Sequence, residues 1–227
     1  MKVALCIGHS RRISHGVTVD GETSSTNDGG AIAADNFTNE WSFNRSIAYL
    51  AKAAIPPHEH DIRVYDVYRG RSYTEAMSDV ARQVEGSDLA IELHFNAYNG
   101  QAKGREAFYW HHSTNGEDFA RRLLDVQGRF LEGEGVEFPN RGAKPATRDT
   151  RGSQFLRKTR PVACLWEWGF GDNPEEWAFY SQNEALLVEV LVESIREWEP
   201  YQQVVNFIGL LVPSAFHINY PSGRCVF

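Results

Sequence analysis

The 227-residue chain has few cysteines, no long apolar run and no excess of positive charge. Its three cysteines are odd in number and widely spaced, which argues against a disulfide framework and suits reduced thiols made in a cytoplasm. The longest apolar stretches, near the start and at 204–212, are shorter than the roughly 18 to 20 residues of a membrane-spanning helix. Together with a mean hydropathy of -0.44, this excludes insertion in a membrane.

Basic residues are outnumbered by acidic ones, 23 to 30, and the formal net charge is -7. Because duplex binding depends on Lys and Arg that neutralise phosphates, nucleic acid is not an expected partner. The first residues, MKVALCIGHSRR, hold one Lys and then five apolar residues, which predicts a first strand rather than a secretion signal. We therefore expect synthesis in the cytoplasm without a signal peptide.

Strand and helix patterns alternate over most of the chain, and no internal repeat is visible. The expected strands are 3–8, 61–67, 89–95, 105–112 and 161–170, and the expected helices are 39–54, 74–85, 116–131, 174–181 and 184–198. Strands joined by helices imply right-handed crossovers. The sequence thus predicts a single α/β domain over 1–198, with a twisted, mostly parallel mixed sheet of about six strands and helices on both faces. Residues 199–227 are expected to form an appendage packed on it.

Two segments show neither pattern. Residues 11–38 are rich in Gly, Ser, Thr, Asn and Asp and are expected to form a long loop, which inside a compact domain tends to be functional. Lys and Arg gather in residues 141–160, RGAKPATRDTRGSQFLRKTR. This second segment is either a solvated loop or a surface that meets an anionic polymer.

The stretch LAIELHFNAYNG at 89–100 reads as a core strand that carries two ionisable residues. Because side chains alternate between faces, Glu92, His94 and Asn96 share one face of this strand. Burying them without partners would cost several kcal/mol. The face therefore meets solvent, or the groups satisfy each other, or a cation lies there.

A second apolar strand, LWEWGF, carries Glu167 between Trp166 and Trp168, two residues that point to the opposite face and are expected in the core. Ligands of parallel sheets bind at the carboxyl ends of the strands. Four candidates fall there or close by: His9, Glu40, His94 and Glu167. Each alone has a structural explanation, but two imidazoles and one carboxylate with an open position form the ligand set of a hydrolytic Zn²⁺, and a further carboxylate can manage protons.

These motifs resemble the zinc-dependent N-acetylmuramoyl-L-alanine amidases of the type 3 family. That family has a strand ending in Gly-His, a Glu opening the next helix, a Ser-x-His-x-Asn-Ala strand end and a late Glu-x-Gly-Phe-x-x-Asn-x-x-Glu. The corresponding stretches here are GHS at 8–10, NEWSFNRSIA at 39–48, ELHFNA at 92–97 and EWGFGDNPEE at 167–176, and the match spans 1–198. Two departures are Ser10-Arg11, where Gly-Gly is common, and Glu92, where Ser is usual.

The resemblance implies a peptidoglycan hydrolase that uses zinc-activated water to cleave the amide bond between N-acetylmuramic acid and the L-alanine of the stem peptide. It implies that His9, Glu40 and His94 hold one Zn²⁺ per chain and that Glu167 is the general base. A zinc peptidase of other specificity and a non-catalytic cell-wall-binding module are the alternatives. Glu167 distinguishes an enzyme from the non-catalytic binding module, because a binding module would not need this carboxylate.

Other residues receive supporting roles. Arg141 and Lys144, in NRGAK, are expected near carboxylates of the anionic stem peptide, with Asn96 as a further substrate-binding residue. Glu92 either accepts a hydrogen bond from a ligating imidazole or pairs with a cation, and Arg69 or Arg71 is the favoured partner.

Without a signal peptide, a wall hydrolase must reach peptidoglycan after release from the cytoplasm. A phage-type endolysin acting at lysis fits best, and a host enzyme acting after mother-cell lysis is the alternative.

Overall fold

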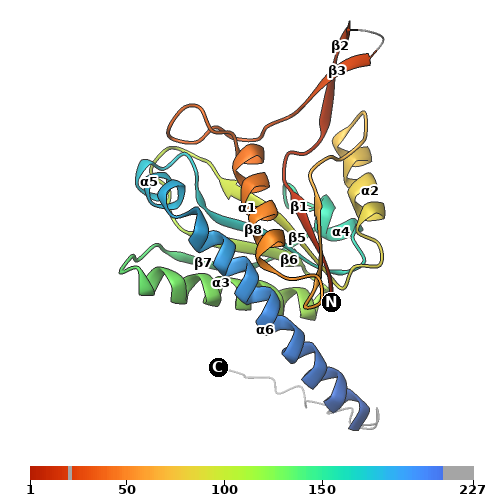
Figure 1. The fold of residues 1–227 in the computed structure, drawn as a ribbon, viewed down its shortest axis with the longest axis vertical. Coiled ribbons are helices and arrows are strands. Elements are labelled where there is room, and N and C mark those ends of the chain that lie inside the picture. The colour runs from red at the N-terminus through yellow and green to blue at the C-terminus, as the bar shows by residue number, and fades with distance from the viewer. Residues whose placement is uncertain (20–21, 212–227) are drawn as a thin grey trace, which may run out of the picture.

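A six-stranded mixed sheet runs through the structure, a computed structural model that describes residues 1–19 and 22–211 (Figure 1). The strands lie in the order β4 (Asp61–Tyr65), β1 (Lys2–Ile7), β5 (Leu89–Asn96), β8 (Val162–Phe170), β6 (Arg105–Trp110) and β7 (Asn140–Ala146). All neighbouring pairs are parallel except β6 and β8. The predicted mostly parallel sheet is confirmed.

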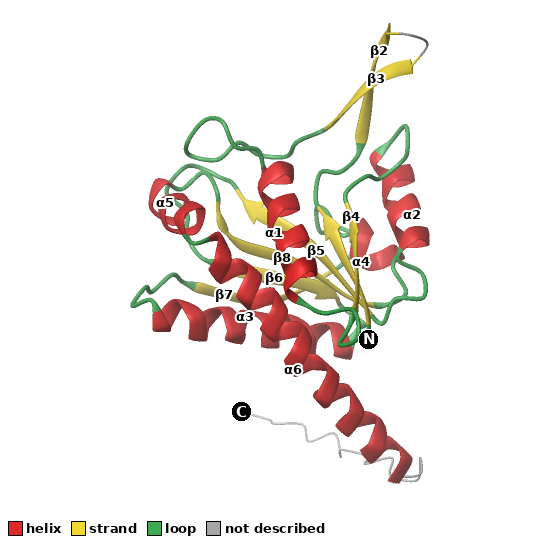
Figure 2. Cartoon of the chain, viewed as in Figure 1, coloured by secondary structure: helices red, strands yellow, loops and turns green. Residues whose placement is uncertain are grey.

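Helices cover both faces of this sheet (Figure 2). On one face, the core is shared with α1 (Glu40–Ala54), α3 (Thr114–Gly133), α5 (Pro174–Gln182) and α6 (Glu184–Leu211). On the other, a smaller core is shared with α2 (Tyr73–Gln83) and α4 (Gln154–Lys158). Apolar side chains on both faces of each central strand explain why these strands read as continuous apolar runs.

Trp166 and Trp168 lie in the larger core with no exposed surface, as predicted. Their indole nitrogens donate hydrogen bonds to Gln127 Oε1 at 3.0 Å and Asn44 Oδ1 at 2.8 Å. Both tryptophans therefore point away from the face that carries Glu167, and they serve packing.

Helix α1 begins at Glu40 because the Asn39 side chain accepts a hydrogen bond from Ser42 N at 2.9 Å. Its first turn lies at the edge of the sheet where the parallel strands end, and Ala31 O accepts a hydrogen bond from Glu40 N. The cap thereby brings Glu40 to the edge at which ligands of parallel sheets bind.

The segment 11–38 is not the featureless loop that we expected. It contains an antiparallel hairpin of β2 (Arg12–Val19) and β3 (Glu22–Asn27), which projects beyond the body of the domain (Figure 1). The sequence prediction relied on apolar periodicity, and a hairpin rich in Ser and Thr provides very little.

The segment 141–160 is likewise more than a loop, since it contains most of β7 and all of α4. Strand β7 is an edge strand with Pro145 in it, which an edge tolerates because one side of the strand needs no ladder hydrogen bonds. Such a half-exposed strand lacks the apolar run by which the central strands were predicted.

Helix α6 continues to Leu211, past the expected end at residue 198. The expected boundary between a domain of residues 1–198 and an appendage of 199–227 therefore lies within a helix, and residues 212–227 lie outside the described residues. Within the described ranges, no helix combines the length and the apolar character needed to cross a bilayer.

Candidate metal and catalytic site

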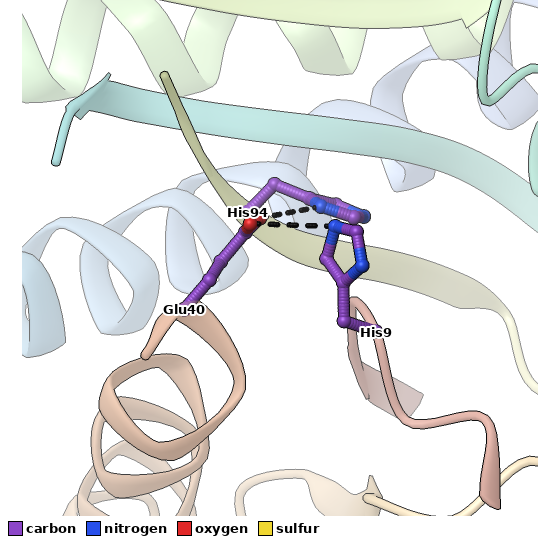
Figure 3. Close-up of side chains that lie close together, drawn as sticks. All are labelled: His9, Glu40 and His94. Atoms are coloured by element: carbon purple, nitrogen blue, oxygen red, sulfur yellow. Dashed lines mark hydrogen bonds and ion pairs between the residues drawn. The ribbon is translucent and has the colours of Figure 1, made fainter. Parts of the chain in front are cut away.

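Three predicted metal ligands meet at the carboxyl edge of the sheet (Figure 3). His9 follows β1, Glu40 opens α1 and His94 lies near the end of β5. Each offers one ligand atom, and these atoms all lie within 4.8 Å of one another. The sequence prediction that these residues come together is confirmed.

Glu40 lies between the two imidazoles and is only 2% exposed. Its Oε1 atom is 2.8 Å from His94 Nδ1, and its Oε2 atom is 3.3 Å from His9 Nε2. Burial raises the pKa of Glu40, but the hydrogen bond and charge of His94, the charge of His9 and the hydrogen bond from Ala31 N outweigh it and lower the pKa below its usual value. Glu40 is thus held as a carboxylate.

The second nitrogen of each imidazole faces another carboxylate. His9 Nδ1 lies 3.1 Å from Asp28 Oδ1, and His94 Nε2 lies 3.4 Å from Glu92 Oε2. Burial lowers the pKa of His94, but its contacts with Glu40 and Glu92 outweigh burial and raise it. An outer carboxylate that fixes the ring orientation and tautomer is the usual arrangement of a metal-ligating histidine.

Asp28 was missed by the sequence analysis because it follows β3 in a segment without periodicity. Glu92 was assigned the wrong favoured partner. Its Oε1 atom accepts a hydrogen bond from Tyr68 Oη at 3.1 Å, whereas the backbone nitrogens of Arg69 and Arg71 donate to Asp79 and Glu75. Glu92 therefore faces the imidazole of His94, in line with the less favoured of the two expectations.

Two glycines allow this close approach. A Cβ atom on Gly8 would collide with the His94 ring. A Cβ atom on Gly30, where φ is +70°, would lie 2.5 Å from Glu40 Oε2 and 2.7 Å from His9 Cδ2. Only glycine fits at either position, because the backbone itself lies against the ligand side chains.

Glu167 lies opposite His94 in the register of β5 and β8. The residue keeps some exposure at the edge, but its Oε2 atom is enclosed and has no hydrogen-bond partner among the described residues. Desolvation is the largest influence and raises the pKa of Glu167 to about 8; His94 opposes this shift, and the negative charges of Glu40, Glu106 and Glu92 add to it. Such a carboxyl can gain or release a proton near neutral pH.

On its other side, Glu167 lies opposite Glu106 of β6, a residue that the sequence analysis missed. Asn96 Nδ2 donates to Glu106 Oε1 at 2.7 Å, and Arg141 Nε donates to Oε2 at 3.0 Å. Lys144 Nζ also donates to Oε2. All three residues expected to bind substrate therefore meet at one carboxylate, beside Glu167.

The donor set fits zinc. Two imidazole nitrogens and one carboxylate are typical ligands of a hydrolytic Zn²⁺, which keeps a further position open. The unpaired Oε2 atom of Glu167 on the adjacent strand also supports a bound ligand at this site. An enclosed oxygen without a hydrogen-bond partner is costly unless a ligand contacts it.

Comparisons with known proteins agree with this geometry. The family model described as N-acetylmuramoyl-L-alanine amidase, of the type 3 amidases, matches residues 3–197. A search of curated proteins gave no match.

Several solved structures are similar to the chain. The catalytic domain of the CD27L endolysin targeting Clostridia difficile is 27% identical, with 86% of this chain and 96% of that one covered and a TM-score of 0.63. The N-acetylmuramoyl-L-alanine amidase from Clostridium difficile 630 is 19% identical, covering 88% and 96%, with a TM-score of 0.66. The amidase AmiC2 of Nostoc punctiforme is 18% identical, covering 88% and 97%, with a TM-score of 0.63. Because the family model extends from the first strand of the sheet into α6, this chain belongs to the type 3 N-acetylmuramoyl-L-alanine amidases.

Proposed function

We propose that this amidase is zinc-dependent and that His9, Glu40 and His94 hold one Zn²⁺ per chain. The observation that carries the proposal is the orientation of the two imidazoles, each of which presents one nitrogen to Glu40 and the other to a carboxylate. A bound zinc ion supplies a Lewis acid that polarises the scissile carbonyl and acidifies water.

Glu167 acts as the general base and then as the general acid. Its Oε2 atom takes a proton from the water that attacks the carbonyl of the lactyl group, and the resulting carboxyl gives the proton to the departing amine of L-alanine. The enclosed, unpaired Oε2 atom supports this role because no protein donor competes for it among the described residues.

Glu92 and Asp28 orient the ligating imidazoles, and Asn96, Arg141 and Lys144 contribute to binding the substrate. The first pair is supported by contacts of 3.4 and 3.1 Å with His94 and His9. The three substrate-binding residues are supported by their shared contact with Glu106 beside Glu167.

Membership of the amidase family selects this activity over the zinc peptidase and the non-catalytic binding module. Peptidoglycan digested with the purified protein should yield free N-terminal L-alanine and intact muramic acid lactyl groups by mass spectrometry. Elemental analysis should find close to one zinc per chain, and chelation should abolish cleavage while leaving most of the fold. Full activity of a metal-free protein would contradict the zinc assignment.

We further propose that the enzyme works as an endolysin that meets the wall at lysis. The support is its similarity to an endolysin catalytic domain, at 27% identity against 18 and 19% for the two other amidases described above. Purified enzyme added to sacculi should then solubilise them without any partner protein, and a requirement for a partner would argue for a different setting.

A further inference from the structure

A pair of cations lies on the sheet edge beyond Glu167, away from the metal ligands. Arg141 and Lys144 of β7 both contact Oε2 of Glu106, which is only 5% exposed. The side chains of the two cations are 38% and 37% exposed. The anchoring carboxylate is therefore enclosed, and the cations are the part of this network that a substrate can reach.

The charges of the network do not cancel, because one carboxylate meets two cations. Glu106 is the acid with which Arg141 and Lys144 pair in the described part of the chain. Arg141 also lies over the ring of Phe170 at 5.0 Å, and Lys144 lies 5.8 Å from the ring of Phe108. These aromatic contacts orient the cations without neutralising them, which leaves one positive charge for an anionic group.

Strand order fixes how far this charge lies from the reacting bond. Glu106 is opposite Glu167, and β7 is the next strand after β6. Adjacent strands are about 4.8 Å apart, so the backbone of β7 lies roughly 10 Å from that of β8, while the cationic groups reach back to Glu106, about one strand spacing from Glu167. An extended peptide covers about 3.3 to 3.6 Å per residue, so one to two strand spacings correspond to at most about three residues.

We propose that Arg141 and Lys144, held in place by Glu106, receive a free carboxylate within the first three residues of the stem peptide. The enzyme then prefers stems that carry this carboxylate over stems in which it is a carboxamide. The inference rests on the proposed cleavage beside Glu167. Arg141 can bind a carboxylate through two parallel hydrogen bonds, and Glu106 is a positioning residue that keeps both cations on the Glu167 side of β7.

The test is a binding measurement that does not depend on turnover. Zinc-loaded Glu167→Gln protein is titrated with two muropeptides that carry three-residue stems and differ only in free carboxylates or carboxamides. The free carboxylates should bind about tenfold more tightly, as expected for charge-assisted hydrogen bonds. Adding Arg141→Gln or Lys144→Gln should bring the ratio below about threefold. Equal affinity of the two muropeptides for the parent protein would overturn the proposal.

Arg148→Gln is the matched control. Arg148 is an exposed arginine of the same basic segment, and its substitution removes the same charge as Arg141→Gln. It should leave the ratio unchanged. If it lowers the ratio as much as Arg141→Gln does, the preference comes from the general charge of the segment, and the proposed site is wrong.

Glu106→Gln tests the positioning role through the sign of its effect. The substitution adds one net positive charge, so a purely electrostatic role of the cations predicts a stronger preference for free carboxylates. Loss of the anchor predicts a weaker preference, with a higher KM for the acidic stem and little change in kcat. A stronger preference would overturn the role of Glu106. If this variant does not fold, the partly exposed Arg141 and Lys144 still decide the proposal.

Failure of this inference can be told apart from failure of the proposed function. Wild-type protein that cleaves both muropeptides equally well, and binds them equally, remains an amidase and contradicts only the carboxylate site. Protein that cleaves neither but still binds the free carboxylates through Arg141 contradicts the proposed chemistry and supports the site.

Discussion

Glu167 and Glu106 lie opposite each other on adjacent strands, yet the two regions around them differ. Glu167 has an enclosed oxygen without a hydrogen-bond partner among the described residues, and its pKa is raised to about 8, chiefly by desolvation. Burial also raises the pKa of Glu106, but hydrogen bonds from Lys144, Arg141 and Asn96 outweigh it and lower the pKa.

The difference teaches that hydrogen-bond partners, rather than burial alone, decide what a shielded carboxyl can do. A carboxyl without donors keeps a proton within reach of neutral pH and can exchange it with a substrate. A carboxylate with three donors stays charged and fixes the position of its partners. The same residue type is therefore suited to the proposed proton transfer on β8 and to anchoring cations on β6.

Removing His94 should have the largest effect, since it takes away both a proposed metal ligand and the imidazole opposite Glu167. We expect His94→Ala to lose stoichiometric zinc and all measurable cleavage, because two ligands cannot hold a hydrolytic zinc site. Elemental analysis and muropeptide digestion provide the measurement. The control is His112→Ala, which removes an exposed imidazole outside the cluster and should leave both unchanged. Zinc retained at one per chain in His94→Ala would contradict the ligand assignment.

Replacing Glu167 removes the proton-exchanging member of the pair alone. Glu167→Ala should keep zinc and fold but lose at least ~10²-fold in kcat, the lower end of what a positioned acid or base contributes. Steady-state kinetics on a muramoyl-peptide, with circular dichroism and zinc content alongside, measure this. Near-normal cleavage by the variant would mean that another carboxylate is the base, and Glu92 would be tested next.

The regions around Glu167 and Glu106 also differ in how well the sequence predicted them. His9, Glu40, His94 and Glu167 were predictable because each interrupts or follows an apolar pattern at the end of an element, where parallel sheets bind ligands. Glu106 was not predictable in this way. Its place beside Glu167 depends on β6 lying between β8 and β7 and running antiparallel to β8, and the order of elements along the chain does not determine that arrangement.

The remaining omissions have a similar physical origin. Asp28 follows a polar hairpin that has no apolar periodicity, and Tyr68 reads as one more residue after a strand. Their importance comes from tertiary contacts with His9 and Glu92. The sheet and most helices were predictable because burial imposes a pattern on them, whereas polar partners are chosen across the fold.

The pH dependence of stability should distinguish the two regions further, because the pKa of Glu167 is raised and that of Glu106 is lowered. With metal removed by chelation, folded protein keeps a proton on Glu167 between about pH 4.5 and 8, where the unfolded chain has lost it. The free energy of unfolding therefore falls as pH rises through this window, by at most about 1.4 kcal/mol per unit for this group. Glu167→Gln should remove the decline between about pH 4.5 and 6.5, above which the raised pKa of His94 adds a decline of its own.

The contribution of Glu106 to stability depends on pH in the opposite direction. Its pKa is lowered in the folded state, so its contribution is present above its unfolded value and is lost as pH falls through its folded value. Glu106→Gln should flatten the acid side of the profile and leave the decline between pH 5 and 8 in place. Denaturant titrations of both variants from pH 3 to 8 test this, and identical profiles would contradict the assigned charge states.

Replacing a third carboxylate, Glu92, tests whether hydrogen-bond partners also determine how tightly the proposed metal ligands bind zinc. Glu92→Gln keeps the shape of the side chain but weakens the acceptor that faces His94 Nε2 at 3.4 Å. We expect zinc affinity to fall by about 10- to 100-fold, as is usual when an outer partner of a ligating histidine is lost. Competition with a chelator of known affinity measures it. Glu85→Gln, an exposed carboxylate paired with Arg160, is the control and should bind zinc normally.

The smallest expected effect lies one contact further from the metal, at Tyr68. Tyr68→Phe keeps the fully buried ring and removes only the hydroxyl that donates to Glu92 Oε1 at 3.1 Å. A single hydrogen bond contributes about 0.5 to 1.5 kcal/mol, which corresponds to a two- to tenfold loss of zinc affinity if Glu92 transmits it fully.

The double variant Tyr68→Phe with Glu92→Gln decides how this loss arises. If the hydroxyl acts by holding Glu92 against His94, its effect on zinc affinity should disappear once Glu92 is replaced, and the two losses will not add. Tyr49→Phe, which removes a hydroxyl that bonds Asp66 at the surface, should leave affinity unchanged in either background. Additive losses would mean that Tyr68 affects the site by another path, and that the chain of contacts from Tyr68 to His94 supports packing rather than the metal.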